Sequence, residues 1–155
     1  MLVWRLASPA YSDILTGEGN RIFGARWNSP GCGVVYTSAN LSLAVLEAYV
    51  HIPPVQRDAL PDFVAVCIQV PDDAGRTDIS VDQLESLIAS ADPLAACRTV
   101  GDRWLSRGDD LILRAPSVVI SEEHNVMLNP AHPQMRDVAV VSTRRFRFDP
   151  RLAAR

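Results

Sequence analysis

The chain has 155 residues, of which 48% are hydrophobic and 21% are charged. This length suits one domain with a substantial core, and the composition argues against a disordered, fibrous or membrane protein. The formal net charge of −3 gives no overall attraction to nucleic acid or to an anionic membrane. We therefore expect a single domain over residues 1–155 that binds neither directly.

The cellular location and the redox environment are predicted from the absence of long apolar segments and of cysteine motifs. No apolar run reaches the roughly 18 residues that a membrane-spanning helix needs, and residues 1–5 lack the long apolar segment of a signal peptide. The cysteines and histidines are scattered and form no metal-ligand spacing. The sequence thus predicts a cytoplasmic protein with free thiols, no disulfide framework and no bound metal.

The first third of the chain alternates between a strand, a loop, a strand and a helix. Residues 2–6 predict a short strand that places Arg5 on the opposite face from Trp4 and Leu6. Repeated Gly and Pro residues in 8–33 predict a long loop, and ordered loops of this length are usually functional. Residues 34–37 predict a strand. A helix follows over 41–51, with Ser38 or Asn40 as its N-cap.

The remaining elements predict an α+β fold. Residues 63–70 form a buried strand pattern, and residues 81–89 and 93–106 form helical patterns. The second of these helices has Asp92 as N-cap and Gly101 as a weak point. Because strands and helices do not alternate regularly, we expect mixed or antiparallel sheets with flanking helices. The further strands are predicted over residues 111–114, 117–120 and 138–148, with a loop over 125–133.

Glu47 is the most informative ionisable residue of the first predicted helix. It lies beside Leu43 and Leu46, near the edge of the apolar stripe, with no nearby cation to neutralise it. Burying an unpaired carboxylate is costly, so Glu47 must be paired, protonated or turned toward a polar cavity. From the helix alone, a boundary Glu that reaches water or a structural Arg is the alternative.

Two arginines are candidates for binding an anion. Arg5 interrupts an apolar strand, and Arg26 follows Gly24 and Ala25, whose small size would let the backbone approach a ligand. A guanidinium offers a rigid fork of donors that matches phosphate or carboxylate. Each could instead be a surface arginine. The chain has no Walker loop and no GxGxxG between strand and helix, so neither standard phosphate cradle is predicted.

Ser117 and Asn125 are the polar candidates in the second half. Ser117 follows Pro116 between two predicted strands, and no Gly-x-Ser-x-Gly elbow makes it a hydrolase nucleophile. We expect its hydroxyl to hydrogen-bond a ligand, with a turn-stabilising role as the alternative. Asn125 begins the following predicted loop, where a turn-forming Asn is again the alternative.

Eight short motifs together resemble the RES-domain toxins, a family named for an Arg, a Glu and a Ser. The resemblance covers nearly the whole chain, and its one departure is Ala25, where the family usually has a second glycine. An added methyl should preserve the loop unless this position needs a positive φ. The motifs are Trp4-Arg5, Gly17-Glu18-Gly19, Gly24-x-Arg26-Trp27-Asn28, Val35-Tyr36-Thr37-Ser38, Leu46-Glu47, Gly101-Asp102-x-Trp104, Pro116-Ser117 and Asn125-x-x-Leu128-Asn129-Pro130-x-His132.

The resemblance implies a fold similar to the ADP-ribosyltransferase toxins, with NAD held in a cleft between two small sheets. It also implies the toxin of a type II toxin–antitoxin module that depletes NAD, with an Xre-like antitoxin as partner. We expect this antitoxin to cover the cleft. The family's Arg, Glu and Ser correspond to Arg26, Glu47 and Ser117, while Tyr36 matches its pocket tyrosine and Arg5 its first-strand arginine. No cofactor is implied beyond NAD as substrate.

These residue types suit cleavage of the nicotinamide–ribose bond. The reaction passes through an oxocarbenium-like state, whose positive charge Glu47 would stabilise. Arg26 and Arg5 would hold the pyrophosphate, Tyr36 would contact the nicotinamide side, and Ser117 would orient the ribose or the amide. Asn125 completes the residues expected to bind NAD. The activity that the resemblance leads us to expect is NAD glycohydrolase or phosphorylase, with protein ADP-ribosylation and non-catalytic NAD binding as alternatives.

Overall fold

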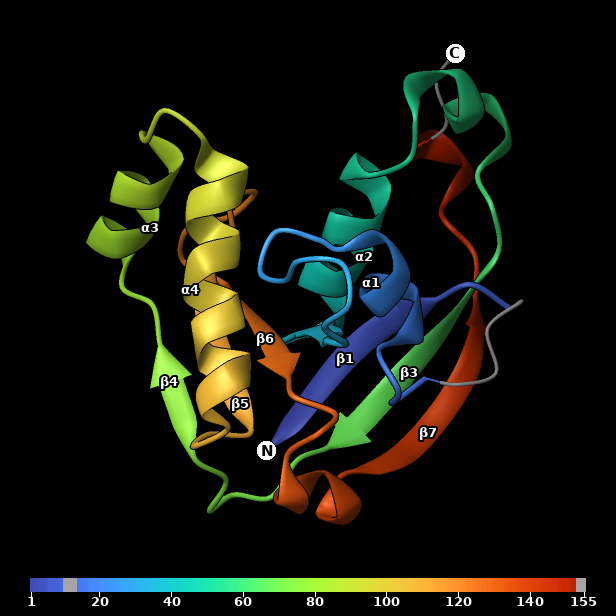
Figure 1. Cartoon of the computed structure of the whole chain (residues 1–155). Coiled ribbons are helices and arrows are strands. Elements are labelled where there is room, and N and C mark those ends of the chain that lie inside the picture. Colours follow the sequence, from blue (N-terminus) through green and yellow to red (C-terminus); the bar gives the residue numbers. More distant parts are fainter. Residues whose placement is uncertain (10–13, 153–155) are drawn as a thin grey trace.

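The computed structural model describes residues 1–9 and 14–152. Within these ranges, no helix combines the length and the apolar character needed to cross a membrane. In chain order, the elements are β1 (Leu2–Ala7), α1 (Glu18–Phe23), β2 (Val35–Ser38), α2 (Leu41–Val50), η1 (Pro54–Ala59), β3 (Phe63–Gln69), β4 (Arg76–Asp78), α3 (Val81–Ile88), α4 (Pro93–Arg107), β5 (Ile112–Pro116), β6 (His124–Leu128), η2 (Pro133–Asp137), β7 (Ala139–Phe146) and η3 (Pro150–Leu152), where η marks a 3-10 helix (Figure 1).

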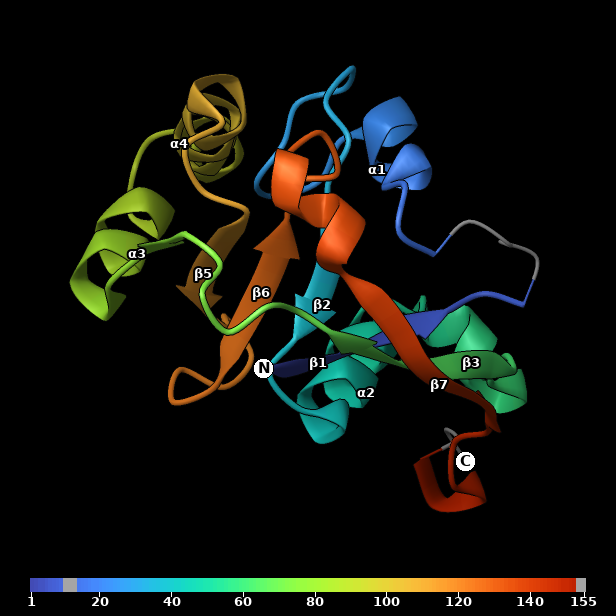
Figure 2. The same ribbon diagram turned by 90° about the horizontal axis from the view of Figure 1, so that it is seen from below.

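The strands form one sheet with a weak junction in its middle. Its order is β4-β5-β6-β2-β1-β3-β7, and neighbours are antiparallel except for β4 and β5. A single pair, Trp4 with Ser38, joins β1 to β2, whereas β1 pairs with β3 along its whole length. The sheet is therefore divided into the halves β4-β5-β6-β2 and β1-β3-β7, whose strands run in clearly different directions in Figure 2.

Two buried clusters hold this arrangement together. The larger one joins both halves of the sheet through alternate strand residues such as Val3, Val35 and Val66, each with no exposed surface. The smaller one lies under α3 and α4, where Trp104 of α4 packs with Met127 of β6. Helix α2 lies apart from α3 and α4, against β1 (Figure 2). Helices thus flank a mixed sheet, which confirms the predicted α+β fold class.

Local capping explains where the helices begin. The Asn40 side chain accepts the backbone N–H of Leu43 at 2.8 Å, and the Asp92 side chain accepts that of Ala95 at 3.0 Å. These bonds satisfy N–H groups that have no partner within the first turn of a helix. Both predicted caps are therefore confirmed, with Asn40 rather than Ser38 at the start of α2.

Four features differ from the sequence-based prediction. Residues 117–120 form no strand but part of the turn between β5 and β6. The predicted loop from Asn125 instead continues β6, because pairing with β2 and β5 outweighs its weak local signal. The predicted loop over 8–33 contains the short helix α1. The three-residue strand β4 was missed, since so short a segment carries no clear alternation.

Candidate functional site

Glu47 receives two hydrogen bonds on one carboxylate oxygen. The Ser117 hydroxyl donates to Oε1 at 2.8 Å, and the Asn125 side-chain amide donates to the same oxygen at 2.5 Å. Glu47 lies on α2, Ser117 directly follows β5, and Asn125 lies on β6. The structure thus brings three of the sequence-predicted residues into one cluster.

The second oxygen of Glu47 is available to a ligand. In the part of the chain that the structure describes, no group donates to Oε2, and Glu47 forms no ion pair. The residue is neither fully buried nor fully exposed. One oxygen is therefore fixed by the protein while the other is open.

The Ser117 hydroxyl is already fully used. It donates to Glu47 and accepts the backbone N–H groups of Val119 at 3.0 Å and Ile120 at 3.2 Å. A hydroxyl has one donor hydrogen and two acceptor lone pairs, and Ser117 is only 1% exposed. Its expected contact with the ribose or the amide stays a prediction, and it would require one of these bonds to break. In this structure the Ser117 hydroxyl holds the Glu47 carboxylate.

Ser38 orients the Asn125 amide. The Ser38 hydroxyl donates to Asn125 Oδ1 at 2.9 Å, which leaves the amide nitrogen directed at Glu47. The two residues lie opposite each other in the ladder between β2 and β6. Sequence reasoning missed this role because it considered Ser38 only as a helix cap. The signal that could have found it is a second hydroxyl two residues after Tyr36, on the same face of a strand.

Tyr36 holds the turn that carries Arg26. Its hydroxyl accepts the backbone N–H of Trp27 and donates to Asn28 Oδ1, both at 2.9 Å. Burial raises the pKa of the Tyr36 phenol far above its usual range, so the group keeps its proton. The buried Asn28 amide donates in turn to the backbone carbonyl of Cys32 at 2.8 Å, which closes the turn from inside.

Helix α4 supports the same turn from outside. A Cβ on Gly101 would lie 1.8 Å from the Trp27 carbonyl oxygen, so only glycine allows this approach. The next residue, Asp102, accepts the Ser29 backbone N–H at 2.9 Å and the Ser29 hydroxyl at 2.6 Å. Gly101, expected from the sequence to be a weak point of the helix, is therefore a contact point of the site.

Arg26 is exposed, and within the described ranges its guanidinium forms no hydrogen bond or ion pair. Arg26 directly precedes Trp27, whose backbone N–H donates to the Tyr36 hydroxyl at 2.9 Å, so Arg26 lies near Tyr36 of β2. Tyr36 and Ser38 are two residues apart and share one face of the strand, about 7 Å from each other. The Arg26 turn and the Glu47 cluster thus lie along the same face of β2.

Arg5 lies on the other face of the sheet. Trp4 pairs with Ser38, so these two side chains lie on the same face of the sheet. Arg5 follows Trp4 in the strand and therefore points to the opposite face, together with Val3 and Ala7 of the larger core cluster. Arg5 Nη1 donates to the Ile14 carbonyl at 2.8 Å, and burial lowers the pKa of its guanidinium. The structure does not bring Arg5 beside Arg26 and Glu47, and its pyrophosphate contact stays a prediction.

With this geometry in view, comparison with known proteins identifies the family. The sequence model of the RES domain matches residues 2–149. The chain is 32% identical over 155 residues to the Prs ADP-ribosylating toxin of Sphingobium sp., covering 96% of this chain and 94% of that protein. It is 33% identical over 154 residues to Toxin Res of Pseudomonas putida, covering 98% and 99%. The chain therefore belongs to the RES domain family, as its motifs predicted.

A solved structure supports the fold. The chain superposes with a TM-score of 0.71 on a chain of the crystal structure of the M. tuberculosis MbcT–MbcA toxin–antitoxin complex. The match covers 98% of this chain and 86% of that chain. At 18% identity, this likeness concerns the fold.

Proposed function

We propose that this chain is the toxin of a toxin–antitoxin pair and that it consumes NAD in the cytoplasm by cleaving the nicotinamide–ribose bond. The relatives in Sphingobium and Pseudomonas are named toxins, and the structurally similar chain belongs to a toxin–antitoxin complex, which supports the first part. The observation that carries the second part is the Glu47 carboxylate. Ser117 and Asn125 hold its Oε1, while its Oε2 has no partner among the described residues.

Glu47 supplies the charge that this reaction needs. When neutral nicotinamide departs, positive charge develops on the ribose, and a carboxylate held nearby lowers the energy of that state. The two donors on Oε1 fix the carboxylate before the substrate arrives, so little reorganisation is required during the reaction. We assign Oε2 as the oxygen that faces the ribose.

Arg26 supplies the opposite end of the site. Its exposed guanidinium has no partner within the described ranges and suits two-point contact with a diphosphate. The hydrogen bonds of Tyr36 to Trp27 and Asn28 keep the turn in place. NAD would then extend past the face of β2 that carries Tyr36 and Ser38, with its diphosphate near Arg26 and its nicotinamide ribose near Glu47. In this arrangement the Tyr36 ring, rather than its hydroxyl, would contact the substrate.

Release of free nicotinamide from NAD by the purified protein tests the proposal directly. We expect Glu47→Gln to abolish release while circular dichroism and the unfolding midpoint stay close to wild type. If Glu47→Gln retains full activity, the assignment of the carboxylate is wrong. Repeating the assay with phosphate separates the two reactions, because phosphorolysis yields a phosphorylated ADP-ribose and hydrolysis does not.

A second candidate function is transfer of ADP-ribose to a protein. The name of the Sphingobium relative, an ADP-ribosylating toxin, favours it. The same bond to nicotinamide breaks, and only the acceptor differs. Labelled NAD incubated with cell lysate would mark a discrete protein band if this reaction occurs. A lysate without any labelled band, alongside continued nicotinamide release, would favour glycohydrolase or phosphorylase activity.

We also propose an Xre-like antitoxin as partner, which covers the NAD site. The toxin–antitoxin complex that contains the structurally similar chain supports an antitoxin as protein partner. Cells should then tolerate expression of this chain only with its antitoxin or as Glu47→Gln. Free growth with the wild-type chain alone would contradict the proposal.

A further inference from the structure

Arg98 is a second guanidinium beside the Arg26 turn. It lies on α4, is half-buried, and its Nε donates to the carbonyl oxygen of Ala25 at 2.9 Å. Ala25 directly precedes Arg26 in the chain. The charges of Arg98 and Arg26 both act on the Tyr36 phenol. The two arginines therefore lie at the same backbone turn, close to Tyr36.

The outer end of the Arg98 fork has no protein partner. In residues 1–9 and 14–152, neither Nη atom makes a hydrogen bond, and Arg98 forms no ion pair. Asp102, one turn further along α4, has the spacing at which an Arg–Asp pair can form. Both of its oxygens instead accept hydrogen bonds from Ser29. A half-buried cation is thus left without the carboxylate that its helix offers.

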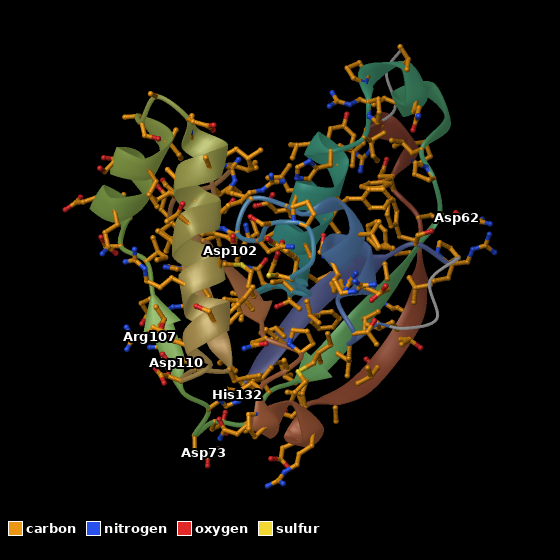
Figure 3. All side chains as sticks on the ribbon, in the orientation of Figure 1. Asp62, Asp73, Asp102, Arg107, Asp110 and His132 are labelled. Atoms are coloured by element: carbon orange, nitrogen blue, oxygen red, sulfur yellow. The ribbon has the colours of Figure 1, made fainter. Side chains whose placement is uncertain are left out.

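Space for a ligand lies in front of this cation. Arg98 lines a hollow of about 310 Å³ that is formed mostly by α4, with Ser29 from the turn. The hollow is also lined by two carboxylates, Asp92 and Asp102, which accept hydrogen bonds from Ala95 and Ser29. Figure 3 shows Asp102 on the side of α4 that faces the turn. A hollow beside a guanidinium whose Nη atoms have no protein partner among the described residues is a suitable place for a phosphate group.

We propose that Arg98 binds the diphosphate of NAD together with Arg26. This inference rests on the proposed function and names the second cation of that site. The diphosphate carries two negative charges, and two guanidinium forks can bind its oxygens from two sides. Arg5 was expected in this role, but it lies on the opposite face of the sheet from Ser38 and Glu47. The bond from Arg98 Nε to Ala25 leaves the Nη atoms for the ligand.

The test compares Arg98→Gln with Arg103→Gln on the same helix. Arg103 is exposed and lies five positions further along α4, on a different side of the helix. We expect Arg98→Gln to raise KM for NAD about tenfold or more, the loss typical of a charged hydrogen bond. Its kcat should stay within about twofold of wild type, because Arg98 is remote from the reacting bond. Arg103→Gln should leave both constants unchanged.

Competition experiments separate a direct contact from mere support of the turn. Arg98→Gln should raise the inhibition constant of ADP-ribose, which contains the diphosphate, and leave that of nicotinamide, which contains no phosphate, unchanged. An equal loss for both inhibitors would overturn the proposal, since Arg98 would then only hold Ala25. If Arg98→Gln instead requires a higher concentration of inorganic phosphate while its inhibition by ADP-ribose is unchanged, the proposal is also overturned. Arg98 would then bind the inorganic phosphate that accepts ADP-ribose.

The outcome for Arg98 can be separated from that for the proposed function by direct binding. Calorimetry with Glu47→Gln measures NAD affinity without turnover, and adding Arg98→Gln should weaken that affinity about tenfold. If the double variant binds NAD less tightly but the wild-type protein releases no nicotinamide, the Arg98 inference stands and the proposed function fails. If the wild-type protein releases nicotinamide and Arg98→Gln behaves as Arg103→Gln, the inference fails and the function stands.

Discussion

Ser38 and Asn125 lie opposite each other in the ladder between β2 and β6, and the Ser38 hydroxyl donates to Asn125 Oδ1 at 2.9 Å. This bond determines which end of the amide faces Glu47, because Oδ1 is occupied and Nδ2 is left to donate. The buried Ser38 thereby sets, through Asn125, the orientation of the carboxylate that carries the proposed reaction.

Removing the Ser38 hydroxyl should slow the proposed reaction through Asn125. We expect Ser38→Ala to lower kcat for nicotinamide release about threefold to tenfold, the effect of roughly one hydrogen bond, with little change in KM. The double variant Ser38→Ala/Asn125→Ala should be no slower than Asn125→Ala, because the two residues act as one unit. Fully additive losses would show that Ser38 acts independently of Asn125.

Ser117→Ala should reduce both stability and activity. The backbone N–H groups of Val119 and Ile120 lose their acceptor, and Glu47 loses one of its two donors. We expect the free energy of unfolding in urea to fall by about 1–3 kcal/mol, together with a lower kcat. If activity falls but the urea midpoint does not move, Ser117 contributes mainly by a direct contact with the substrate.

Gly101→Ala should disturb the turn that carries Arg26. The new methyl would lie 1.8 Å from the Trp27 carbonyl oxygen, so α4 and the turn must separate. We expect a loss of about 1–3 kcal/mol in the free energy of unfolding and a higher KM for NAD. Gly19→Ala is the matched control, because nothing lies within 4 Å of its Cβ position in helix α1. It should be neutral or stabilise by about 0.5–1 kcal/mol. Equal effects of the two variants would contradict the contact.

The stability of the wild-type protein should decrease above about pH 10, the ordinary pKa of tyrosine. Burial raises the Tyr36 pKa, so the folded state keeps a proton that the unfolded state releases. The contribution of this group is therefore complete below pH 10 and is lost as pH rises further, by up to about 1.4 kcal/mol per pH unit. Between pH 8 and 11, the free energy of unfolding should fall more steeply with pH for wild type than for Tyr36→Phe. The same pH dependence in both proteins would show that a group other than Tyr36 causes the loss of stability.

Local features of the fold could be predicted from the sequence because they depend on neighbouring residues. The caps at Asn40 and Asp92 and the core strand of residues 63–69 follow from nearby side chains and from apolar patterning. The same local reasoning was wrong for residues 117–120, where the apolar run predicts a strand. Two backbone N–H groups bind the Ser117 hydroxyl instead, and the chain turns.

The sequence by itself determined the family, the fold class and Glu47 as a carboxylate that needs partners. Only the tertiary structure decided that these partners are Ser117 and Asn125, 70 and 78 residues away along the chain. It also put Arg5 on the opposite face from Glu47 and brought Arg98 to the Arg26 turn. The physical reason is that hydrophobic periodicity and capping act over one or two helical turns, whereas the register of strand pairing and helix packing joins residues that no local pattern relates.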